Sequence, residues 1–130
     1  MPTNKILVID DEEDFSNTIK MMLELAGDYE IVSACDGKEG IKKAHLVRPD
    51  LILLDIKMPE MDGLEALKIL KGNPETMSIP VVMLTACDED IYKLKACQLY
   101  DEDYLVKPVK TEILIDRVKK VMARRKISGK

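Results

Sequence analysis

Five short apolar runs recur along the chain, and polar or helically spaced segments separate them. The runs cover Ile6–Ile9, Glu30–Ala34, Leu51–Leu54, Val81–Leu84 and Tyr104–Val106. Most of them are unbroken instead of alternating with polar residues. Strands that have helices on both faces show such runs, because neither face meets water. The pattern therefore predicts five strands of a parallel sheet that is covered on both sides.

The segments between the runs carry the spacing of amphipathic helices. In the first segment the apolar residues recur on one helix face, at Phe15, Ile19, Met22, Leu23 and Ala26. Gly27 follows where such a helix would end. Asp62 and Glu65 have the spacing of a capping box and are expected to open the third helix. The last helix is expected from about Thr111 to Arg125.

Strands and helices alternate along the whole chain, which predicts an α/β domain with a doubly wound (βα)5 arrangement and right-handed crossovers. A chain of 130 residues suits one domain. Only 22 residues follow Pro108, enough for one helix and a short tail. We therefore expect one domain over residues 1–126, a C-terminal tail over residues 127–130, and no separate effector domain.

Composition and charge narrow the class of protein. The apolar share of 46% and the charged share of 34% describe a folded, water-soluble chain. The net charge of −4 argues against nucleic-acid binding. Seven basic residues lie between Arg117 and Lys130, and we assign them to a helix end whose dipole favours cations. Three cysteines without a CxxC pair, no apolar run long enough for a membrane and no signal-peptide pattern predict a cytoplasmic location.

Polar side chains follow four of the five predicted strands. Asp10 and Asp11 follow the first, Asp55 the third, Thr85 the fourth and Lys107 the fifth. Ligands of open parallel sheets bind at the carboxyl ends of the strands, so these side chains are expected to share one cleft. An acid after a strand is commonly only a helix cap, and it is the joint placement of all five that indicates a site.

Three carboxylates in one cleft repel one another unless a cation lies between them, and oxygen ligands suit Mg²⁺. An aspartate beside Mg²⁺ can attack a phosphoryl group. Thr85 and Lys107 would then contact the phosphoryl oxygens, where charge accumulates during transfer. The residues alone therefore predict Mg²⁺-dependent phosphoryl chemistry at Asp55.

Four segments of the chain resemble the signature blocks of the receiver domain of two-component response regulators. They read LVIDDEED, PDLILLDIKMPEMDGLEALKIL, IPVVMLTA and DEDYLVKP, and the resemblance extends from about Lys5 to Val121. It implies a flavodoxin-like fold with a five-stranded sheet in the order 2-1-3-4-5. It also implies a stand-alone regulator of the chemotaxis-regulator type.

The resemblance assigns roles to the acidic residues by position. Asp55, which opens DIKMPEMDG, matches the phosphoacceptor. Asp11 matches the acid that binds Mg²⁺ directly, and Asp10 the acid that acts through a water molecule. The backbone carbonyl of Lys57 matches the remaining ligand from the protein.

The remaining signature positions form the switch. Thr85 matches the hydroxyl that turns toward the phosphoryl group, and Lys107 matches the lysine that pairs with that group, with a cis peptide bond to Pro108. Tyr104 matches the aromatic residue that turns inward on activation. Ala86 matches the small residue that keeps the site open.

Several positions depart from the usual receiver pattern, and two others are expected to affect the rate of dephosphorylation. Leu99-Tyr100 replaces the frequent Gly-Ala pair, and Val109 stands where Phe is common. Lys57 and Cys87 lie two residues after the phosphoacceptor and after the threonine, beside the expected path of an attacking water. Neither side chain is an obvious ligand for that water, so we expect slow dephosphorylation.

The function implied is that of a phosphoprotein switch. A histidine kinase or a phosphotransfer protein would supply the phosphoryl group, and the chain would catalyse its own phosphorylation and dephosphorylation only weakly, without being an enzyme in the ordinary sense. The face formed by the fourth helix, fifth strand and fifth helix would change shape. Output would pass through a downstream protein, through a phosphorylation-dependent homodimer or by onward transfer.

Two other classes of function use similar folds. A haloacid-dehalogenase type of phosphohydrolase needs a second acid two residues after its nucleophile, where this chain has Lys57. A flavin carrier needs a phosphate-binding loop after the first strand, where DDEED would repel phosphate. The only histidine, His45, is expected to lie in a helix, on its surface or half-buried, and not to be a phosphotransfer residue.

Overall fold

The computed structural model describes residues 4–86 and 103–128, with side chains of the last helix described through Arg124. Within these ranges one sheet contains the strands β1 (Asn4–Ile9), β2 (Tyr29–Ala34), β3 (Leu51–Asp55), β4 (Val81–Thr85) and β5 (Asp103–Val106). Their order is β2-β1-β3-β4-β5, and every neighbouring pair is parallel. The expected flavodoxin-like doubly wound sheet is confirmed.

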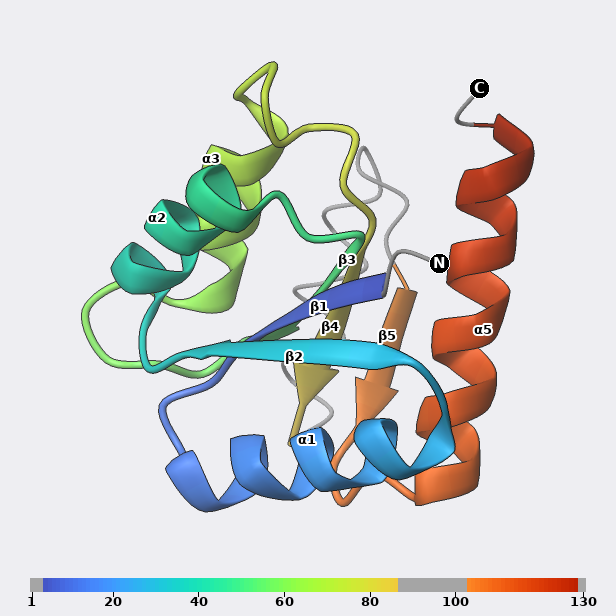
Figure 1. Ribbon diagram of the computed structural model, residues 1–130. Coiled ribbons are helices and arrows are strands. Elements are labelled where there is room, and N and C mark those ends of the chain that lie inside the picture. Colours follow the sequence, from blue (N-terminus) through green and yellow to red (C-terminus); the bar gives the residue numbers. More distant parts are fainter. Residues whose placement is uncertain (1–3, 87–102, 129–130) are drawn as a thin grey trace.

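Helices cover both faces of this sheet (Figure 1). The described helices are α1 (Glu13–Ala26), α2 (Gly37–Val47), α3 (Gly63–Lys71) and α5 (Thr111–Ser128). Helices α1 and α5 pack on one face, and α2 and α3 lie on the other (Figure 1). The fourth helix and the Leu99-Tyr100 pair expected from the sequence lie outside the described residues.

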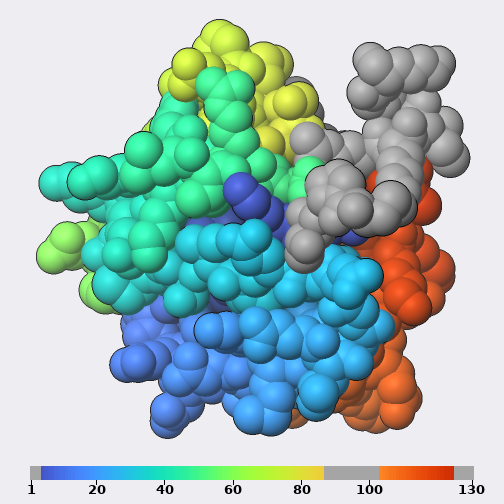
Figure 2. All heavy atoms as spheres, in the orientation of Figure 1, coloured from blue at the N-terminus to red at the C-terminus, as the bar shows by residue number. Residues whose placement is uncertain are grey.

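The hydrophobic core has two halves, one on each face of the sheet. In β3, Leu51 and Leu53 join the half formed with α1 and α5, whereas Ile52 and Leu54 join the half formed with α2 and α3. All four side chains are fully buried. Side chains of β2 and of the helices beside it cover much of β1 in the space-filling view (Figure 2). This two-sided burial explains why the inner strands β1, β3 and β4 contain unbroken apolar runs.

Local signals set the ends of several helices. The Asp62 carboxylate accepts a hydrogen bond from the backbone N–H of Glu65 at 2.9 Å, as the capping box predicts. Gly27 ends α1 as expected. Helix α5 continues to Ser128, beyond the expected end at Arg125 and into the expected tail. Gly129 is the first helix-breaking residue that follows in the sequence, which accounts for the longer helix.

His45 lies in the last turn of α2, which leads toward the start of β3. Its Nδ1 atom is 2.9 Å from a carboxylate oxygen of Glu75, and its side chain is 30% exposed. His45 is thus half-buried in a helix, in agreement with the expectation of a surface or half-buried position. Among the described residues, no helix combines the length and the apolar character needed to cross a membrane.

Candidate functional site

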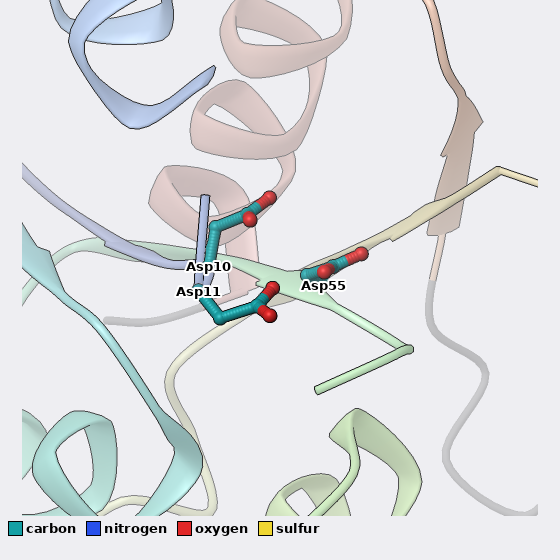
Figure 3. Close-up of side chains that lie close together, drawn as sticks. All are labelled: Asp10, Asp11 and Asp55. Atoms are coloured by element: carbon teal, nitrogen blue, oxygen red, sulfur yellow. The ribbon is translucent and has the colours of Figure 1, made fainter. Parts of the chain in front are cut away.

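Three carboxylates meet at the carboxyl edge of the sheet. Asp10 and Asp11 follow β1, and Asp55 is the last residue of β3. One oxygen atom from each lies within 4.8 Å of the others. In the close-up all three side chains project into the same space beyond the strand ends (Figure 3). The parallel arrangement of β1 beside β3 thus brings together residues that are 45 positions apart in the sequence.

The three acids differ in burial. Asp10 and Asp55 are only 1% and 4% exposed, whereas Asp11 is exposed. Asp10 Oδ1 accepts a hydrogen bond from the backbone N–H of Glu12 at 2.8 Å, and its Oδ2 accepts one from Lys107 Nζ at 3.0 Å. Asp10 is therefore held in place on both sides, and Asp11 forms the solvent-facing side of the cluster.

Lys107 extends from the end of β5 into the acidic cluster. Its Nζ atom lies 3.0 Å from Asp10 Oδ2, 3.3 Å from Glu12 Oε1 and 3.4 Å from Asp55 Oδ1. Its backbone N–H donates to the carbonyl oxygen of Thr85 at 2.7 Å, which connects this lysine to the end of β4. The peptide bond to Pro108 is cis, as expected.

Burial and charge together alter the acidities in this cleft. Burial, and next the charge of Asp10, raise the pKa of Asp55 from 3.8 to about 7, although Lys107 opposes the change. Burial also raises the pKa of Asp10. For Lys107, burial by itself lowers the pKa, but the surrounding carboxylates outweigh it and raise the pKa. One ammonium group therefore does not balance the negative charge of the cleft.

A glycine allows the loop after β3 to fold back against Asp55. The backbone N–H of Gly63 donates to the carbonyl oxygen of Ile56 at 2.7 Å. A Cβ atom at Gly63 would lie 2.1 Å from the carbonyl oxygen of Asp55, so a larger residue would displace the backbone. The MDG segment therefore positions the central carboxylate of the site through a close backbone contact.

Thr85 and Tyr104 lie on neighbouring strands beside the cluster. Thr85 is fully buried at the end of β4, directly after Leu84, which pairs with Asp55. Tyr104 is half-buried and packs against the core half that contains α2 and α3. Its carbonyl oxygen accepts a hydrogen bond from Arg117 of α5 at 3.0 Å. The fold thus places Thr85 beside the strand end that carries Asp55, and Tyr104 on the next strand with a hydrogen bond to α5.

The remaining residues that the sequence predicts at the site are Lys57, Ala86 and Cys87. Lys57 and Ala86 are exposed beside the cleft, and Cys87 lies outside the described residues. Two contacts were not expected from the sequence, those of Lys107 with Glu12 and with the ring of Phe15. Glu12 belongs to the acidic run, and Phe15 was assigned to the apolar face of its helix. Phe15 is the nearer of the two to Lys107 in the sequence, and 92 positions still separate them. No local sequence pattern could therefore predict these contacts.

The cluster fits a bound Mg²⁺ ion by its chemistry. It offers carboxylate oxygens only, which hard cations prefer. It also contains more negative than positive charge, because Lys107 pairs with both Asp10 and Asp55, and Asp11 lies beside them. Asp10, Asp11 and Asp55 are the residues that would hold the ion.

The comparisons with known proteins agree with this fold. The family model of the response regulator receiver domain matches residues 6–119. The chain belongs to this family.

Individual relatives show how far the similarity extends. The alkaline phosphatase synthesis transcriptional regulatory protein PhoP of Bacillus subtilis is 40% identical over 96% of this chain and 51% of its own length. The DNA-binding dual master transcriptional regulator RpaA of Synechocystis is 37% identical over 92% of this chain and 49% of its own length. The chain thus spans about half the length of these curated relatives. Among solved structures, chemotaxis protein CheY4 of Vibrio cholerae is 32% identical with a TM-score of 0.80, covering 92% of this chain and 99% of that one.

Proposed function

We propose that Asp55 accepts a phosphoryl group from the phosphohistidine of a sensor kinase or a phosphotransfer protein, and that the chain acts as a signalling switch. The observation that supports this most directly is the position of Asp55. Its carboxylate is buried at the end of β3, next to Asp10 and Asp11 and 3.4 Å from Lys107 Nζ. A nucleophile, a set of metal-binding oxygens and a cation for phosphoryl oxygens therefore share one site.

In the transfer step an oxygen of Asp55 attacks phosphorus and forms the new P–O bond. The P–N bond of the donor breaks, and its electron pair stays on the imidazole, which takes up a proton from solvent. Lys107 balances charge on the phosphoryl oxygens, since its ammonium group is already beside Asp55. Mg²⁺, held by the three aspartates and the Lys57 carbonyl, would supply further charge stabilisation.

The phosphoryl group then acts through Thr85 and Tyr104. It adds a charge of about −1.5 to −2 at Asp55. The Thr85 hydroxyl turns toward this charge, and Tyr104 moves into the space that is released. Tyr104 lies on β5, and its backbone is hydrogen-bonded to Arg117 of α5, so the side chain moves within the β5–α5 part of the output face.

Output passes from this face to a downstream protein or to a second copy of the chain. We propose that this receiver domain, whose last helix runs to Ser128, acts as a cytoplasmic regulator with weak self-catalysed phosphorylation and dephosphorylation. Nucleic acid has no role in this proposal, because the chain carries a net charge of −4.

The test is phosphorylation by acetyl phosphate with and without Mg²⁺, followed by mass spectrometry. We expect one phosphoryl group on Asp55 in Mg²⁺ only. The Asp55→Asn variant should stay unmodified, and Asp116→Asn, which changes an exposed acid on α5, should behave like the parent. Labelling of Asp55→Asn at another residue would refute the site. Rapid steady release of phosphate from phosphate esters would instead favour the phosphohydrolase.

A further inference from the structure

On the side of α1, the ammonium group of Lys107 contacts an aromatic ring in addition to a carboxylate. The centroid of the Phe15 ring is 4.2 Å from Nζ, within the range in which an aromatic face attracts a cation. Glu12 Oε1 lies 3.3 Å from the same atom. Glu12 directly precedes α1 and Phe15 follows three residues later, a spacing that places both on one side of the helix.

Phe15 is suited to be a fixed support. It is half-buried and packs against the core half formed with α1 and α5, so the core determines where its ring lies. An aromatic face is uncharged and accepts no strong hydrogen bond. It can therefore attract the ammonium group of Lys107 and leave its N–H donors available for oxygen atoms.

Glu12 has the opposite properties. Its side chain is 67% exposed, and its carboxylate competes for the same ammonium group. An ion pair at such a rim contributes little, because water solvates the acid when the pair opens. The contact between Glu12 and Lys107 is thus one that phosphoryl oxygens can replace.

We propose that the first turn of α1 positions Lys107 for the phosphoryl group. Phe15 holds the ammonium group beside Asp55, and Glu12 is an exchangeable partner that the phosphoryl oxygens displace. Both are positioning residues, because they act through Lys107. The inference rests on the proposed function and extends it to two residues to which the resemblance assigns no role.

The first test measures the affinity for beryllofluoride, a phosphoryl mimic, in Mg²⁺ by NMR titration. Phe15→Leu keeps an apolar side chain but removes the aromatic face, and we expect affinity to fall about three- to tenfold. Phe15→Tyr keeps the face and should restore the affinity of the parent. Equal affinities of Phe15→Leu and the parent would overturn the role of Phe15.

The second test uses a matched pair of acids. Glu12→Gln removes the competing charge, and we expect affinity to rise about two- to fivefold. Glu13→Gln removes the same charge from the next residue, which is also exposed, and should have a smaller effect. Equal effects of the two substitutions would show that Glu12 acts only through general charge, and the proposed exchange would be wrong.

A third readout requires no ligand. The Phe15 ring current should shift the ε-ammonium resonance of Lys107 in ¹H–¹⁵N spectra, and the shift should disappear in Phe15→Leu but persist in Phe15→Tyr. An unchanged resonance in Phe15→Leu would contradict the contact. Failure of the parent to bind beryllofluoride, or binding by Asp55→Asn, would instead contradict the proposed function.

Discussion

The ionised Asp55 carboxylate should destabilise the metal-free protein, and Asp55→Asn should remove this cost. Burial raises the pKa of this group from 3.8 to about 7, so the folded state binds the proton more tightly than the unfolded state does. The carboxyl group therefore favours folding in its protonated form. Its contribution is complete below about pH 4 and is lost as the pH rises through about 7.

The pKa change of Asp55 sets the size of the expected difference in the free energy of unfolding. Roughly three pKa units at ~1.4 kcal/mol each set an upper limit of about 4 kcal/mol above pH 7. Asparagine has nearly the shape of the protonated acid and carries no charge. We expect Asp55→Asn to raise the free energy of unfolding by about 2–4 kcal/mol at pH 8.5, and by less than about 1 kcal/mol at pH 4.

Urea unfolding in a chelator at several pH values measures this difference. Asp11→Asn is the matched control, because Asp11 belongs to the same cluster but is exposed. We expect it to change stability by less than about 1 kcal/mol at every pH, as removal of an exposed charge usually does. A gain for Asp55→Asn that is independent of pH, or no gain at pH 8.5, would show that burial of the charge is not the cause.

Three further substitutions test other parts of the site. Gly63→Ala should cost about 1–3 kcal/mol of stability in urea unfolding and slow phosphorylation by acetyl phosphate, because the new methyl group meets the Asp55 carbonyl; unchanged stability would contradict the close contact. Thr85→Ala should still be phosphorylated but lose most of the phosphorylation-dependent NMR shifts on β5 and α5, and shifts equal to those of the parent would exclude the hydroxyl from the switch. Lys57→Asn should shorten the lifetime of the phosphoprotein, since an amide can orient an attacking water; identical decay would remove this position from hydrolysis.

Sequence patterns alone predicted the strands and helices and the sheet edge at which the three carboxylates meet. Unbroken apolar runs mark strands that are buried on both faces, and this signal is local, so the runs matched the strands to within two residues. The capping box of Asp62 and Glu65 is equally local and was confirmed. Because all strands of the sheet are parallel, residues that follow strands must meet at one edge. That topological rule predicted the grouping of Asp10, Asp11 and Asp55.

The burial and the contacts of each of these residues became evident from the three-dimensional fold. A linear pattern does not state which acid is covered by its neighbours, and burial is what separates Asp55 from the exposed Asp11. It also does not state which side chain a long lysine will reach. Lys107 meets Phe15 and Glu12 because β5 and the start of α1 converge at the same edge, a contact across more than ninety residues of sequence. Distance and burial depend on all elements at once, so the acidity and the partners of these groups became evident only after the chain was folded.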